Sequence, residues 1–157
     1  MPELLRKMAV YDGTPYTRAA LQLIALTLVR TTKLIEAKWD EFDLNAAEWR
    51  IRASRMKMRT PYILPLSRQA VDALRCLYEL RRLSPYVFPG ERDHERPMSN
   101  NTILKALERL GYKHRMTGHG FRGIASTLLH EMSFPHAHIE LQLAHLGISE
   151  ERDRSFR

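Results

Sequence analysis

The stretch Thr117-Gly118-His119-Gly120-Phe121-Arg122 stands at the predicted start of a helix. His119 and Arg122 are three residues apart, so both side chains lie on one helix face if the first turn extends back to His119. A helix N-terminus also offers unpaired backbone N–H groups and a positive dipole end. The pattern predicts a phosphate site in which an imidazole, a guanidinium and backbone donors meet. The alternative is that His119 caps the helix and Arg122 is a solvated surface residue.

Apolar residues recur at helical spacing on both sides of this stretch. Ser67 is the predicted N-cap of one helix, Ser99 or Asn100 is the predicted cap of the next, and Gly111 is predicted to end it. Helices are predicted over 17–29, 33–39, 69–82, 102–110, 121–132 and 135–146. The chain is therefore expected to be mainly helical.

Residues 48–53 change to an alternation of polar and apolar side chains, which is the pattern of a half-buried strand. A second strand is predicted over 62–66, and the polar, basic segment 54–61 connects the two. Residues 40–45 are predicted to form a turn before the first strand. The fold class that follows is α+β, mainly α, with a small antiparallel sheet that includes a hairpin with a basic tip.

Composition excludes several classes of protein. Apolar residues make up 44% and charged residues 27% of the 157, the balance of a soluble globular domain. No apolar run reaches the roughly 18 residues of a membrane helix, and residues 1–18 lack the pattern of a secretory leader. Cys76 is the single cysteine, which excludes a disulfide framework and a cysteine zinc site. We therefore expect a cytoplasmic protein that does not associate with membranes.

The charge balance points to an anionic partner. Lys and Arg number 25 against 18 Asp and Glu, a formal net charge of +7. Nineteen of these 25 cations are Arg, whose rigid fork of donors suits phosphate oxygens. Nucleic acid is the first candidate partner. On charge alone, a basic protein without such a partner is the alternative.

Three more basic residues occupy unusual places in the sequence. Arg30 directly follows a strongly apolar helix, Lys57 lies in the basic hairpin tip 55–59, and His145 stands at the end of an apolar helix. With the opening stretch, they give the order Arg, Lys, His-x-x-Arg, His along the chain.

In this order the chain closely resembles the catalytic domain of tyrosine recombinases, in particular prophage and genomic-island integrases. The matching segments are 25–30, 36–43, 55–67, 119–122 and 143–145. The resemblance implies site-specific DNA recombination, the integration or excision of a mobile element, through a 3′-phosphotyrosine intermediate. It also implies double-stranded DNA as the partner. No metal or nucleotide cofactor is expected, because fixed cations can stand in for a metal ion.

The resemblance also implies a role for each residue of the set. Arg30 and Arg122 would clamp the scissile phosphate and neutralise charge in the transition state. Lys57 would protonate the leaving 5′-oxygen, and His119 would assist proton transfer from the nucleophile. His145 would hydrogen-bond a non-bridging oxygen.

Further cations are expected to contact the surrounding duplex. Arg55 and Arg59 flank Lys57 in the hairpin tip, and Arg115 lies in the basic segment 113–120 before the opening stretch. All three are predicted DNA contacts.

One position departs from the pattern of the family close to the first arginine. Lys33 stands where these proteins usually carry an acidic residue, three positions after Arg30. A cation there either repels Arg30 or adds a contact to DNA. Glu36, one turn further on, is the candidate replacement partner of Arg30.

The nucleophilic tyrosine is missing from its expected place. All six tyrosines lie at or before Tyr112, and Phe156 is the residue nearest the expected position. Ser155 carries a hydroxyl, but no base is adjacent. Residues 1–157 are therefore expected to be a catalytic domain that lacks an N-terminal core-binding domain and ends at or before the nucleophile. Alone it would form no covalent intermediate and would be a monomer, whereas the intact protein would act as a tetramer.

Three other interpretations are open. A non-catalytic DNA-binding remnant of an integrase would also lack the tyrosine, and the reading frame beyond Arg157 distinguishes it from a truncated enzyme. A helical protein-interaction module would leave Arg30 and Lys57 unexplained. A metal hydrolase would draw on four histidines near the C-terminus, although Phe134 occupies the position of the second ligand in a zinc-protease helix motif. These histidines are His130, His136, His138 and His145.

Overall fold

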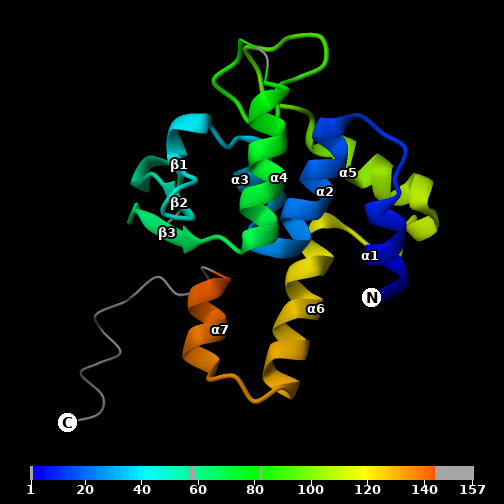
Figure 1. Cartoon of the computed structure of the whole chain (residues 1–157). Helices are drawn as coiled ribbons and strands as arrows, with labels where there is room; N and C mark the ends of the chain where they lie inside the picture. Colours follow the sequence, from blue (N-terminus) through cyan, green and yellow to red (C-terminus); the bar gives the residue numbers. More distant parts are fainter. Residues whose placement is uncertain (1, 57–58, 82, 144–157) are drawn as a thin grey trace.

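The computed structural model describes residues 2–56, 59–81 and 83–143, and Figure 1 shows their arrangement. Helices dominate, as the sequence predicts, and a small sheet lies beside them. The α-helices are α1 Pro2–Ala9, α2 Pro15–Thr27, α3 Thr31–Ile35, α4 Arg68–Glu79, α5 Asn100–Leu107, α6 Gly118–Glu131 and α7 His136–Gln142. The strands are β1 Phe42–Asp43, β2 Glu48–Ile51 and β3 Tyr62–Pro65. Shorter helical turns are η1 Trp39–Glu41, η2 Ala53–Arg55 and η3 Glu108–Tyr112.

The predicted hairpin is confirmed as the antiparallel pair β2–β3, in which Trp49 lies opposite Leu64. Both of these side chains are fully buried, so the inner face of the pair belongs to the core. The turn predicted over 40–45 is confirmed only at its end, because the turn occupies residues 44–47. Residues 39–41 form the 3₁₀ turn η1, and Phe42 and Asp43 then pair with Trp49 and Glu48 as a third strand. The sheet order is β1-β2-β3.

Helix boundaries follow the predicted capping residues closely. The Ser67 hydroxyl accepts the Ala70 N–H at the start of α4, and Ser99 accepts the Asn101 N–H at the start of α5. Gly111 has a φ of +87°, a value that suits glycine, within the turn that follows α5. One predicted boundary is wrong, because the helix expected over 33–39 ends at Ile35, and helix α1 was not predicted at all.

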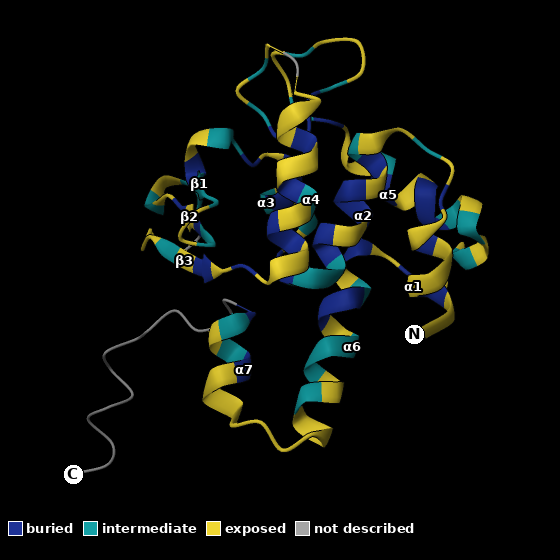
Figure 2. Cartoon of the chain, viewed as in Figure 1, coloured by how far each residue is buried: buried dark blue, intermediate teal, exposed yellow. Residues whose placement is uncertain are grey.

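The core lies between the helices α1 to α5 and the inner face of the sheet (Figure 2). Trp49 from β2, Phe88 from the segment before α5, and Phe121 from α6 are the largest side chains in it. Helices α6 and α7 extend away from this body as a pair, and their far ends are mostly exposed (Figures 1 and 2). The near ends of α6 and α7 therefore meet the body where α2 ends and β3 begins.

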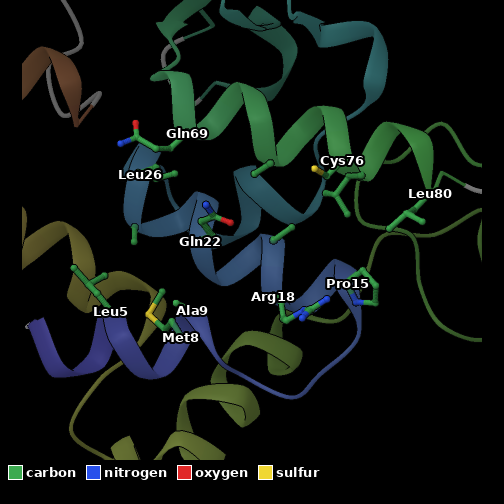
Figure 3. A pocket seen from close by; sticks show the side chains of 14 residues that line it. Leu5, Met8, Ala9, Pro15, Arg18, Gln22, Leu26, Gln69, Cys76 and Leu80 are labelled. Atoms are coloured by element: carbon green, nitrogen blue, oxygen red, sulfur yellow. The ribbon is translucent and has the colours of Figure 1, made fainter.

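A groove of about 590 Å³ lies between α1, α2 and α4 (Figure 3). Its lining is largely apolar and also includes the polar side chains of Arg18, Gln22 and Gln69 and the thiol of Cys76. Arg30, His119 and Arg122, the predicted phosphate-site residues that the structure describes, do not line this groove. In the part of the chain that the structure describes, no helix combines the length and the apolar character needed to cross a membrane.

Candidate active site

The first turn of α6 packs directly on the junction between α2 and α3. A Cβ atom at Gly118 would collide with the Thr31 hydroxyl and would lie 3.1 Å from Cδ1 of Ile24. Glycine is therefore required for this close approach. The contact brings the start of α6, with His119 and Arg122, beside the start of α3, where Arg30 is the N-cap residue.

Arg122 is buried at this junction, with 3% of its surface exposed. Its Nη1 donates to the carbonyl of Leu28 and its Nη2 to the carbonyl of Leu143, each at 2.5 Å. Nε is buried and has no hydrogen-bond partner among the described residues. The alternative that Arg122 is a solvated surface residue is therefore wrong. A buried guanidinium with an unmade hydrogen bond is costly to a protein, which suggests a functional reason for it.

Burial and the nearby charge of Arg30 both make the charged form of Arg122 less favourable. Burial lowers the pKa of Arg122 most, and the nearby charge of Arg30 lowers it further, whereas Tyr62 and Glu140 act in the opposite direction. Arg30 itself is exposed. The structure thus brings the two predicted phosphate-clamping arginines within electrostatic reach of each other. Such a pair favours an anion between them.

His119 lies in the first turn of α6 on the same helix as Arg122, so the expected extension of the turn is confirmed. The side chain that caps α6 is Thr117, whose hydroxyl accepts the Gly120 N–H at 3.1 Å. His119 is exposed and is not the cap, so that alternative is wrong. Because Thr117 already uses the Gly120 N–H, this donor is not open to a phosphate as the sequence suggested.

The C-terminal end of α7 is tied to the same junction by residues that sequence analysis did not assign to the site. The Tyr62 hydroxyl donates to the carbonyls of Leu141 and Gln142, at 2.9 and 3.2 Å. Burial raises the pKa of Tyr62, against an opposing effect of Arg122, so the hydroxyl keeps its proton and acts as a donor. Tyr62 was predicted to lie in the second strand, but no sequence signal linked this strand to α7.

Arg55, predicted to contact DNA, instead forms an ion pair inside the protein. Its Nη1 donates to both carboxylate oxygens of Glu41 at 2.5 Å, and its Nη2 donates to the Lys33 carbonyl at 2.6 Å. The Trp49 indole N–H also donates to Glu41, at 3.1 Å. The Glu41 side chain is 1% exposed and the Arg55 side chain 16%. The guanidinium therefore faces inward and joins the start of the hairpin connection to α3.

Lys33 lies next to these charges and is partly buried. Burial lowers its pKa most, followed by the charges of Arg55 and Arg30, while Glu36 and Glu41 raise it. Of the two effects expected from a lysine here, this placement favours repulsion of Arg30. The pairing of Glu36 with Arg30 stays a prediction.

The remaining predicted residues are placed as follows. Arg59 and Arg115 are exposed, and the Arg115 guanidinium carbon lies 5.3 Å from the centre of the Tyr112 ring. Lys57, His145 and Phe156 lie outside the described residues, and so does Ser155.

The histidines of the metal-hydrolase alternative are only partly brought together. His130 and His136 are in contact, and His138 is exposed. Within residues 2–56, 59–81 and 83–143, no group of three or more His, Cys, Asp or Glu side chains is arranged to hold a metal ion. His145 lies outside these ranges.

Comparison with known proteins identifies close relatives in sequence. The model of the phage integrase family matches residues 2–152. The chain is 38% identical to prophage integrase IntA of Escherichia coli K12 over 152 residues, which are 97% of this chain and 37% of that protein. It is 40% identical to the integrase of Enterobacteria phage P4 over 159 residues, covering 92% of this chain and 36% of the relative. The chain thus spans little more than a third of these relatives.

Solved structures show the same fold. XerA recombinase superimposes with a TM-score of 0.75 at 20% identity, covering 96% of this chain and 57% of that one. XerH site-specific recombinase bound to its difH substrate gives a TM-score of 0.76 at 16% identity, covering 99% and 48%. At these identities the likeness concerns the fold, and it confirms the expected class: mainly α with a small antiparallel sheet.

Proposed function

The chain belongs to the phage integrase family, and from that premise we propose that it is the catalytic domain of a site-specific DNA recombinase. The whole protein would integrate or excise a mobile element by breaking and rejoining DNA strands through a 3′-phosphotyrosine intermediate. Its substrate would be double-stranded DNA, and it would act in the cytoplasm. Two structural neighbours are complexes of this kind, XerH recombinase bound to its difH substrate and the Tn1549 transposon integrase with circular intermediate DNA, which supports this choice of partner.

The observation that carries the proposal is the buried guanidinium of Arg122 beside Arg30. The protein has already removed water from Arg122, and Nε lacks a partner among the described residues. A fixed cation in a dry site interacts with a phosphate far more strongly than one in water. Nη1 and Nη2 each donate one hydrogen to Leu28 and Leu143, so the Nε–H and the second hydrogen of each Nη are the donors left for phosphate oxygens.

The proposed mechanism assigns each cation a separate task. Arg30 and Arg122 neutralise charge that develops on the phosphate as the phosphodiester is attacked. Lys57 donates a proton to the leaving 5′-oxygen, His119 assists removal of the proton from the nucleophile, and His145 hydrogen-bonds a non-bridging oxygen. The protein–phosphate bond retains the energy of the broken phosphodiester, so rejoining needs no nucleotide.

DNA contacts outside the reacting phosphate belong, in this proposal, to exposed cations. Arg59 and Arg115 are exposed and would contact the duplex backbone. Arg55 has a different proposed role, because its ion pair with Glu41 faces the interior. It would hold the connection that carries Lys57 against α3 and would act on DNA through Lys57.

These 157 residues contain no tyrosine after Tyr112, which raises a second candidate function. We propose that the polypeptide alone forms no covalent intermediate and binds DNA without cleaving it, as a non-catalytic remnant would. Tyr62 is no substitute nucleophile, because its hydroxyl donates to backbone carbonyls and burial raises its pKa. The whole protein would assemble as a tetramer and this chain alone would be a monomer, for which light scattering would report 18.4 kDa.

The test of the site is covalent trapping on a nicked suicide substrate, in a full-length protein that contains this chain and a nucleophilic tyrosine. Arg30→Ala and Arg122→Ala are expected to reduce the trapping rate by about 10²–10³, the effect of removing one transition-state donor. Arg75→Ala, at an exposed position on α4, is the matched control and is expected to trap at the wild-type rate. Wild-type trapping by both test variants would show that the assignment is wrong.

A further inference from the structure

Two histidines meet at the far end of the α6–α7 pair, away from the arginine junction. His130 lies in the last turn of α6 and His136 is the first residue of α7. Nε2 of His130 lies 3.1 Å from Nδ1 of His136, and the ring centres are 5.4 Å apart at an angle of 40°. Both side chains are exposed. The proposed recombination mechanism uses neither of them.

The hydrogen bonds of His130 determine which of its nitrogens carries a lone pair. Nδ1 lies 2.7 Å from the carbonyl of Ser126, one turn earlier in α6. A carbonyl only accepts, so Nδ1 must carry the hydrogen, and Nε2 presents a lone pair toward His136. This is the arrangement of a metal-binding histidine, in which the second ring nitrogen donates to a backbone carbonyl that fixes the ring.

The separation of the two nitrogens matches that of two ligands on one ion. With metal–nitrogen distances of about 2.05 Å, two ligands lie about 2.9 Å apart at a right angle and about 3.3 Å apart at the tetrahedral angle. The observed 3.1 Å falls between these limits. The His130 ring is held by the Ser126 carbonyl, whereas the exposed His136 ring can turn about χ2 so that its Nδ1 lone pair points to the same ion as Nε2 of His130.

We propose that His130 and His136 form a two-histidine site for a divalent transition metal that prefers imidazole, such as Zn²⁺, Ni²⁺ or Cu²⁺. Water completes the coordination sphere, since the site is open to solvent. The ion takes the place of the proton that His136 shares with His130 in the free protein, and the displaced proton moves to Nε2 of His136. A bound ion would join the end of α6 to the start of α7 across the turn between them.

The test is metal titration of the tag-free chain by calorimetry, with Zn²⁺, Ni²⁺ and Cu²⁺ in turn. A Cys76→Ser background removes the exposed thiol as a competing ligand. We expect one equivalent to bind, and His130→Gln and His136→Gln each to weaken binding at least tenfold. His138→Gln is the matched control, because His138 is an exposed histidine on the same helix as His136, and it is expected to bind as the parent does.

Three results would overturn the proposal. They are the absence of binding up to millimolar metal, unchanged binding in both His130→Gln and His136→Gln, and an equal loss in His138→Gln, which would indicate a diffuse histidine-rich surface. Because both side chains are exposed, the variants are expected to fold, and circular dichroism checks this. Nitrogen hyperfine splitting from two imidazoles in the Cu²⁺ spectrum of the parent, reduced to one in each variant, gives an independent readout.

Discussion

At the scale of single residues, Arg122 shows what sequence could and could not predict. Its spacing from His119 placed both on one helix face, and the structure confirms that they share the first turns of α6. No pattern in the sequence indicated that the guanidinium is buried against the carbonyls of Leu28 and Leu143. These partners lie 94 and 21 residues away, and only the packed fold brings them together.

Gly118 is the residue on which this packing depends. Gly118→Ala is expected to destabilise the fold by about 1–3 kcal/mol, because the added methyl group collides with the Thr31 hydroxyl. Urea unfolding measures this change. The variant is also expected to bind DNA more weakly, because the collision pushes Arg122 away from Arg30.

Gly123 in the same helix provides the matched control. It has open space around it, so Gly123→Ala is expected to stabilise the protein by about 0.5–1 kcal/mol through helix propensity alone. Adding Thr31→Ala to Gly118→Ala is expected to recover part of the lost stability. Equal effects at the two glycines would contradict the close approach of α6 to α3.

Because Tyr62 is partly buried, we expect the free energy of unfolding to depend on pH in the alkaline range. Burial raises the pKa of Tyr62 in the folded state. Below about pH 10, the ordinary pKa of tyrosine, the hydroxyl is neutral in both states. Above it, the unfolded chain loses the proton first, so the free energy of unfolding falls as pH rises.

Tyr62→Phe removes this ionisation together with two hydrogen bonds. We expect a loss of about 0.5–1.5 kcal/mol at pH 7 and a smaller decline in stability between pH 9 and 11 than in wild type. Urea unfolding across this range measures both effects, with Tyr78→Phe at an exposed position as the control. A wild-type slope in Tyr62→Phe would contradict the role given to this hydroxyl.

At the scale of elements, the periodicity of the sequence predicted the hairpin β2–β3 better than it predicted the two-residue strand β1 and the eight-residue helix α1. Alternation over 48–53 gave β2, and capping serines gave the starts of α4 and α5. The two-residue strand β1 has too little length to show a period, and it forms because its partner β2 holds it. Helix α1 is polar on average, with only Leu4 and Met8 buried, and was missed for that reason.

The ion pair between Glu41 of η1 and Arg55 of η2, together with the hydrogen bond from Arg55 to the Lys33 carbonyl of α3, joins three elements. The spacing of these residues in the sequence did not predict it. Glu41→Gln is expected to cost about 3 kcal/mol, near the lower end for breaking a buried pair, because Arg55 keeps some exposure. Asp40→Asn is the neighbouring control. Asp40 pairs with Arg52, and both side chains are more than half exposed, so we expect a change of about 0–1 kcal/mol. Similar losses in the two variants would contradict a structural role for Glu41.

At the scale of the whole molecule, the net charge of +7 predicts that salt controls binding to DNA. The logarithm of affinity is expected to fall linearly with the logarithm of salt concentration, with a slope of about −0.9 for each phosphate contact. Fluorescence anisotropy with a duplex measures the slope. Arg59→Ala and Arg115→Ala are each expected to reduce its magnitude by about 1, and Arg75→Ala is expected to leave it unchanged. Binding that is indifferent to salt would contradict the phosphate contacts.

The buried guanidinium of Arg122 has a consequence for the kinetics of this binding. Water leaves Arg122 when the chain folds, so its dehydration adds nothing to the barrier that DNA must cross. What is left is a local rearrangement that opens the buried Nε–H of Arg122, unpartnered within the part of the chain that the structure describes, to a phosphate oxygen, while the carbonyls of Leu28 and Leu143 hold the guanidinium in place. Association would then proceed in two phases: an encounter that salt slows, followed by a local rearrangement whose rate depends on neither salt nor DNA concentration.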